Sequence, residues 1–155
     1  MNIINNMKIE KANIIDHKIL TEITKKSKAY WGYSEEQLLK WSDNLTVTPV
    51  YIESNNIFKL TTNLLIIGYY SYIIKEEKTA YLDNMFIAPE YIGKGFGKFL
   101  INDFLNRMKT ENFKKITLHS EPNAELFYQK MGFIKIGALK TSIKNRFMPI
   151  MEMNL

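Results

Sequence analysis

The segment IGKGFGK, residues 92–98, combines the two features by which proteins hold phosphate groups, closely spaced glycines and lysines. Glycines let backbone N–H groups approach an anion, and a helix that begins directly after them carries partial positive charge at its first turn. An apolar run that ends at Pro89 precedes this segment, and apolar residues at helical spacing follow it from Phe96. The pattern predicts a strand, a glycine turn and a helix N-terminus arranged to bind a pyrophosphate. The alternative is a glycine turn that binds no ligand.

Two other phosphate-binding loops do not fit this segment. A P-loop, G-x-x-x-x-G-K-[ST], would need a glycine at Ile92 and a serine or threonine at Phe99. The dinucleotide fingerprint G-x-G-x-x-G would need a glycine at Lys98 or at Leu100. The sequence therefore argues against an ATPase or kinase and against a Rossmann-type dinucleotide site.

The composition fits one domain, which we predict over residues 1–155, because 46% of the residues are hydrophobic and can bury a single core. The absence of cysteine excludes disulfides, thiolate metal sites and a cysteine nucleophile. The N-terminus lacks the pattern of a signal peptide, and the longest apolar run, residues 64–74, is too short to span a bilayer. We therefore expect a soluble cytoplasmic protein that does not bind membranes.

The net charge of +5 is compatible with a nucleic acid, an anionic surface or a polyanionic small ligand. The lysines are spread along the chain rather than blocked, so most of them are expected to form a solvated surface. A nucleic-acid-binding domain is a third hypothesis that rests on charge alone, and nucleic acid is not an expected partner.

Hydrophobic spacing and turn residues predict the order of the elements. Strands are expected at residues 7–12, 57–60, 64–74, 80–87, 114–120, 133–139 and 147–153. Helices are expected at residues 14–31, 34–41, 96–108 and 124–131, with Ser34 and Asn123 as N-caps and Gly132 as the terminator of the last. Gly68 inside a strand indicates a bulge or a close approach of the backbone. This order predicts a mixed α/β fold with a largely antiparallel sheet and helices on its faces.

These segments resemble the GNAT superfamily of acyl-CoA-dependent N-acyltransferases, and the small-molecule subgroup in particular. The family signature [QR]-x-x-G-x-[GA] matches residues 92–97, except that Ile92 stands where Gln or Arg is usual. The family segment N-A-x-x-F-Y-x-K-x-G-F matches residues 123–133. The resemblance covers nearly the whole chain. It implies a central, mostly antiparallel sheet of six to seven strands, about four flanking helices and a splayed cleft between strands 4 and 5.

The resemblance also implies acetyl-CoA as the cosubstrate and an N-acetyltransferase that acts on a small-molecule or peptide amine, with a homodimer as a family analogy. The pantetheine arm would pair with the edge of the fourth strand at Met85, Phe86 and Ile87. The pyrophosphate would lie against Ile92, Gly93, Lys94, Gly95, Phe96, Gly97 and Lys98. Asn123 is expected either to cap its helix or to bind the pantetheine arm, and both roles can coexist.

Acetyl transfer requires a proton acceptor for the amine and a proton donor for the departing thiolate. Tyr128 matches the family's general acid, and its phenol suits protonation of a thiolate. The alternative is a core tyrosine on an apolar helix. For the acceptor, Tyr81 and Asp83 share one face of the fourth strand and Glu121 follows the fifth, and Asp83 is preferred. The alternative for Asp83 is a surface ion pair.

The amine pocket is the least defined part of the prediction. Trp31, Tyr33 and Trp41 would line it together with Tyr81, and Arg146 would recruit a carboxylate. Equally, the aromatic residues could only anchor the first two helices on the sheet. His119 could face either the core or the site, and two isolated histidines do not make a metal centre. A non-catalytic acetyl-CoA sensor is the second functional hypothesis.

Overall fold

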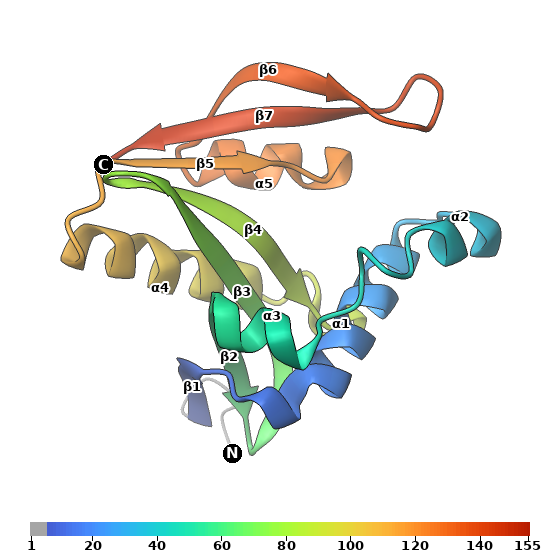
Figure 1. Ribbon diagram of the computed structural model, residues 1–155, viewed down its shortest axis with the longest axis horizontal. Helices are drawn as coiled ribbons and strands as arrows, with labels where there is room; N and C mark the ends of the chain where they lie inside the picture. Colours follow the sequence, from blue (N-terminus) through green and yellow to red (C-terminus); the bar gives the residue numbers. More distant parts are fainter. Residues whose placement is uncertain (1–5) are drawn as a thin grey trace. The chain divides into compact units, whose positions relative to one another are not determined.

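The computed structural model describes residues 6–155, which form a mixed α/β fold around one seven-stranded sheet (Figure 1). The strand order is β1-β2-β3-β4-β5-β7-β6. The strands are β1 Met7–Lys11, β2 Asn56–Thr62, β3 Leu65–Glu76, β4 Thr79–Ile87, β5 Lys115–His119, β6 Ile134–Lys140 and β7 Phe147–Asn154. The helices are α1 His17–Tyr30, α2 Glu35–Lys40, α3 Pro49–Ser54, α4 Phe96–Thr110 and α5 Glu125–Lys130. None of the helices in this part of the chain has the length and hydropathy to cross a membrane.

Most predicted elements are present, and one helix was not predicted. The Ser34 hydroxyl accepts a hydrogen bond from the Gln37 N–H at 3.1 Å and so begins α2 as expected. The unpredicted helix is α3, where the Thr48 hydroxyl caps the Tyr51 N–H and Pro49 occupies the first turn. A six-residue helix is too short to show a repeating apolar pattern. The only sequence signals for α3 are therefore its cap, Thr48, and Pro49 in its first turn.

Contacts between residues divide the chain into two compact units. The first unit contains the chain up to Ser71 together with Asn84–Phe104, and the second contains Tyr72–Asp83 together with Leu105–Leu155. Strands β3 and β4 and helix α4 each contribute residues to both units. It stays a prediction that the whole chain forms one domain. This prediction requires that the protein unfolds in a single transition.

The core of the first unit lies between α1, α3 and strands β2 and β3. Its buried residues are Ala12, Leu20, Ile23, Val47, Ile52, Ile57 and Tyr69. Beside this core, the Lys59 ammonium forms a shielded ion pair with the Asp16 carboxylate at 2.8 Å. The same Asp16 oxygen accepts the Asn13 N–H at 2.8 Å, so it also fixes the turn η2, Ile14–Asp16, that leads into α1.

The second unit contains the parallel pairing of the sheet and its last hairpin. Strand β5 pairs in parallel with β4 and antiparallel with β7, and β6 pairs antiparallel with β7 (Figure 1). Buried Ile116 and Leu118 alternate along β5 with Thr117 and His119, so one face of the strand is packed and the other is open.

Strand β4 is longer than its pairing with β5. The paired residues are Thr79–Leu82 and Lys115–Leu118, and β4 then continues to Ile87 while β5 ends at His119. Within residues 6–155, the backbone groups on that edge of residues 83–87 therefore have no partner strand. The splayed cleft between strands 4 and 5 that the family resemblance implies stays a prediction.

Gly68 on β3 explains how the neighbouring strand comes so close. A Cβ placed at Gly68 would lie 2.7 Å from Ile87 Cδ1 and 2.8 Å from the Phe86 carbonyl oxygen. Both distances are shorter than van der Waals contact, so only glycine fits here. The prediction of a close backbone approach at Gly68 is confirmed.

Candidate functional site

The glycine segment of the first unit forms a turn followed directly by a long helix. Gly93 and Gly95 have φ of +80° and +87°, a left-handed conformation that glycine adopts without strain. Helix α4 begins at Phe96, and the Phe99 N–H donates to the Gly95 carbonyl at 3.1 Å. The N–H groups of the first turn thus precede the first helical hydrogen bond and are available to an anion.

Side chains at the start of the helix anchor this turn. The Tyr91 ring contacts the Phe96 ring edge-on at 5.6 Å, and Phe96 is buried. The Lys94 ammonium lies 5.9 Å from the centre of the Tyr91 ring. Ile92, which replaces the usual Gln or Arg of the signature, is half-buried. The sequence analysis did not include Tyr91 among the site residues. The signal that could have identified it is an aromatic residue between the end of the strand at Ile87 and the start of the helix at Phe96.

The first unit also holds a polar cluster that the sequence reasoning missed. The Asn84 amide donates to the Tyr51 hydroxyl at 3.1 Å and to the Ser71 hydroxyl at 3.0 Å. The two hydroxyls are 2.9 Å apart, and Ser71 is fully buried. This cluster fixes β4 immediately before Met85, the first of the strand residues expected to hold the pantetheine arm.

A pocket of about 290 Å³ in the first unit lies between α1, the start of β3 and the chain after β4. Ile23, Ile67 and Ala88 contribute apolar surface to it, and Glu22 and Lys26 contribute charge. The predicted amine-binding aromatics are not among its lining residues.

The predicted aromatics of the first two helices form a cluster of their own. The Tyr33 and Trp41 rings meet edge-on at 4.9 Å, and the Lys28 ammonium lies 5.6 Å and 5.3 Å from their centres. This packing joins the end of α1 to the end of α2, and both the amine pocket and the anchor on the sheet stay predictions. Trp31 is exposed beside Tyr30.

Tyr128 of the second unit lies on α5 and is almost completely buried. Its ring packs edge-on against Phe133 at 5.6 Å and Phe127 at 5.2 Å. Burial raises the pKa of the Tyr128 phenol above its ordinary value. The phenol is therefore protonated throughout the physiological pH range and can donate a hydrogen bond.

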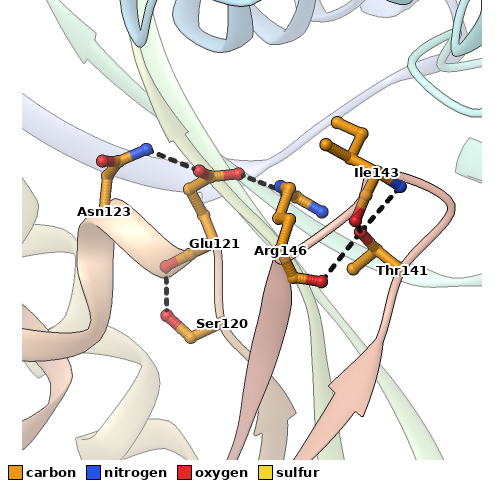
Figure 2. Close-up of polar contacts among 6 residues, drawn as sticks. All are labelled: Ser120, Glu121, Asn123, Thr141, Ile143 and Arg146. Atoms are coloured by element: carbon orange, nitrogen blue, oxygen red, sulfur yellow. Dashed lines mark hydrogen bonds and ion pairs between the residues drawn. The ribbon is translucent and has the colours of Figure 1, made fainter.

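Glu121 and Arg146, which the sequence reasoning treated as independent candidates, form an ion pair at 3.0 Å (Figure 2). Their side chains are only 14% and 11% exposed. The second carboxylate oxygen of Glu121 accepts the Asn123 amide at 2.8 Å. Both oxygens of Glu121 are thus engaged, and this pair joins the end of β5 to the turn before β7.

The prediction that Asn123 caps the last helix is wrong. A short turn, η4 Pro122–Ala124, precedes α5, and Ala124 occupies the N-cap position without a side-chain hydrogen bond. The Asn123 amide turns to Glu121 instead, because a carboxylate two residues away accepts a stronger hydrogen bond than a neutral group.

Tyr81 lies on β4 of the second unit beside His119 of β5. The two rings meet edge-on at 5.2 Å, and the Lys75 ammonium lies 5.3 Å from the centre of the Tyr81 ring. Burial and the negative charge of Asp83 raise the pKa of the Tyr81 phenol. Partial burial and the charge of Lys75 lower the pKa of the His119 imidazole. The sequence did not determine whether His119 faces the core or the site. In the structure it lies on the open face of β5.

Comparison with known proteins identifies relatives of the chain. The model of the family described as "Acetyltransferase (GNAT) domain" matches residues 29–155. Among curated proteins, the uncharacterized N-acetyltransferase ycf52 of Pyropia yezoensis is 39% identical over 49 residues. This match spans 32% of the chain and only 28% of that relative.

Two solved structures illustrate the similarity of fold. PaiA N-acetyltransferase from Thermoplasma acidophilum, in complex with coenzyme A, superimposes with a TM-score of 0.81 at 23% identity. That match covers 96% of this chain and 99% of the other. A spermidine N-acetyltransferase SpeG chimera from Vibrio cholerae and hSSAT gives a TM-score of 0.75 at 26% identity, with coverage of 96% and 95%.

Proposed function

Because the chain belongs to the GNAT family of acetyltransferases, we propose that it transfers an acetyl group from acetyl-CoA to a primary amine. In this proposal the transfer is direct, within a ternary complex of protein, acetyl-CoA and amine. The observation that carries the proposal is the continuous path from the unpaired end of β4, through the glycine turn, to the first turn of α4. This path presents main-chain N–H and C=O groups, the kind of group that can bind the amides of a pantetheine arm and a pyrophosphate.

Each part of this path has a separate role in the proposal. The amides of the pantetheine arm pair with the backbone of Met85–Ile87 as an added strand would. The pyrophosphate lies on residues 92–98, whose N–H groups and lysines supply positive charge. The side chain at position 92 is not required, because Tyr91 and Phe96 already hold the turn. The coenzyme A bound to the Thermoplasma acidophilum protein supports the choice of ligand.

Tyr128 is proposed to donate a proton or hydrogen bond to the departing thiolate. Burial raises the pKa of this phenol, so the hydroxyl keeps its proton and can donate it to a ligand. Of the two carboxylates considered for the amine proton, Glu121 is engaged by Arg146 and Asn123. Asp83, the first residue of β4 beyond its pairing with β5, remains the carboxylate candidate.

The proposal is tested by thermal unfolding with acetyl-CoA, and with ATP and NAD as polyanionic controls. A ligand at about 100 times its dissociation constant adds roughly 2.7 kcal/mol, which raises the unfolding midpoint by about 5–11 °C in a domain of this size. We expect that rise with acetyl-CoA alone, followed by thiol release when amines such as spermidine are added. An equal rise with all three ligands would contradict the assignment of the pyrophosphate site. Acetyl-CoA binding without thiol release would favour the sensor hypothesis instead.

A further inference from the structure

We propose that His119 accepts the proton of the substrate amine, and that Tyr81 and Lys75 hold it in place for that purpose. This inference rests on the proposed acetyl transfer and names a residue of the same site. His119 is the last residue of β5 and lies directly after the final residue pair between β4 and β5, Leu82 with Leu118. It therefore lies at the end of β5, directly after the last residue of that strand that pairs with β4.

The placement of His119 makes its ring accessible to a substrate. Its neighbour Leu118 is buried, so alternation along the strand directs His119 to the open face, on which Thr117 also lies. His119 is exposed, and no hydrogen bond to either ring nitrogen is found within residues 6–155. Both nitrogens are thus available to a ligand.

Two neighbouring side chains orient the imidazole and control its charge. The Tyr81 ring supports it edge-on at 5.2 Å, and the Lys75 ammonium lies 5.3 Å from the centre of that ring. Partial burial, and after it the positive charge of Lys75, lowers the pKa of His119 and favours the neutral imidazole that can take up a proton. The other charged residues along these strands are Asp83 on β4, Lys115 on β5, which pairs with Glu152 of β7 at 4.0 Å, and Glu121 after β5, which pairs with Arg146.

An imidazole suits this step better than a carboxylate. A general base works best when its pKa lies near the working pH, and histidine is the side chain whose ordinary value comes closest. In the proposed step, the substrate ammonium gives one proton to His119. The C–N bond then forms at the acetyl carbonyl carbon as the C–S bond breaks. The second amine proton ends on the released thiol, and His119 returns its proton to solvent.

The first measurement follows the protonation of His119 by NMR and needs no ligand. The sequence contains two histidines, so the variant His17→Gln leaves a single imidazole signal. We expect the pKa of His119 to lie below the ordinary value of about 6.5. Lys75→Met should raise it, because the neighbouring positive charge is lost. A pKa at or above the ordinary value, with no response to Lys75→Met, would overturn the proposed control of His119.

The second measurement is the pH dependence of kcat/KM, with the amine that the wild-type protein acetylates fastest among spermidine, benzylamine and an alanine-terminated peptide. We expect activity to fall at low pH with the pKa found by NMR. His119→Gln should reduce kcat about 100-fold and abolish this acidic limb, whereas His17→Gln should keep both. Lys75→Met should move the limb to higher pH by the amount that NMR reports.

Several results would overturn the proposal. If the acidic limb survives His119→Gln in a variant that unfolds at the wild-type temperature, His119 is not the proton acceptor. If Asp83→Asn abolishes the limb instead, the acceptor is the carboxylate. A wild-type protein that acetylates none of the amines and gains no stability from acetyl-CoA overturns the proposed function itself. An active wild type with an unaffected His119→Gln variant overturns only the role of His119.

Discussion

The replacement Gly68→Ala tests whether the close approach of β3 and β4 shapes the cosubstrate edge. The added Cβ would lie 2.8 Å from the Phe86 carbonyl oxygen, whereas ordinary contact begins at 3.4 Å, so the strands must separate by about 0.6 Å. The contact with Ile87 Cδ1, at 2.7 Å, can be relieved by side-chain rotation, but the carbonyl belongs to the main chain. We therefore expect a loss of about 1–3 kcal/mol in the free energy of unfolding, as in overpacked cores.

The same displacement should weaken acetyl-CoA binding. The carbonyl that must move belongs to Phe86, between two residues proposed to pair with the pantetheine arm. Loss of one backbone hydrogen bond, at roughly 1 kcal/mol, raises the dissociation constant about fivefold. Urea unfolding and isothermal titration calorimetry with acetyl-CoA measure the two effects separately.

Gly137→Ala is the matched control, because it makes the same change in another strand. A Cβ at Gly137 would lie 3.5 Å from Ile150 Cδ1, which is an ordinary contact. We expect its unfolding free energy to stay within about 0.5 kcal/mol of wild type. If Gly68→Ala behaves like Gly137→Ala, the argument from close approach is refuted. If it destabilises the protein without weakening acetyl-CoA binding, the proposed pantetheine edge is wrong.

Further substitutions address the remaining parts of the site. Tyr128→Phe should lower turnover about 100-fold while calorimetry finds unchanged acetyl-CoA binding, and a variant within threefold of wild type would exclude Tyr128 as proton donor. Since burial raises the pKa of Tyr128, its neutral form stabilises the fold below pH 10, and wild type should lose stability relative to Tyr128→Phe as pH rises above about 10. Arg146→Gln should cost about 3 kcal/mol in urea unfolding, and adding Glu121→Gln should cost less than the sum of the single changes, because it removes the charge left unpaired. Gly95→Ala should lower the free energy of unfolding by about 1–2 kcal/mol, because alanine is strained in the left-handed conformation of this residue, and it should weaken acetyl-CoA binding. An unchanged affinity would show that the turn does not bind acetyl-CoA.

The sequence predicts those features that depend on local chemistry. The cap at Ser34, the left-handed turn at Gly132 and the start of α4 at Phe96 follow from residue types within one turn of each other. The close approach at Gly68 is also predictable, because a glycine inside an apolar strand leaves space beside the main chain for another part of the protein. That the space is taken by the Phe86 carbonyl depends on strand register, which no local pattern contains.

The parts that the sequence left open depend on long-range pairing. Whether Glu121 and Arg146 act separately or bind each other depends on the β6–β7 hairpin returning to the end of β5, across 25 residues of chain. Asn123 shows the same limit, because its capping tendency competes with a carboxylate whose orientation is set by Arg146. His119 could be given a face only once the burial of Leu118 was known.

The glycine turn before α4 has a consequence for how this protein could be redesigned. The groups proposed to bind the pyrophosphate are main-chain N–H donors fixed by the φ angles of Gly93 and Gly95, and no Cβ at either position would meet another atom within 4 Å. The part of the affinity that comes from these main-chain groups depends on backbone conformation and not on side chains elsewhere in the chain. Substitutions at Thr117 on the open face of β5 can therefore be screened for new amine acceptors while the glycine turn is left unchanged. In the proposed function, recognition of the acyl donor therefore depends mainly on backbone conformation, and recognition of the amine depends on side chains that can be exchanged.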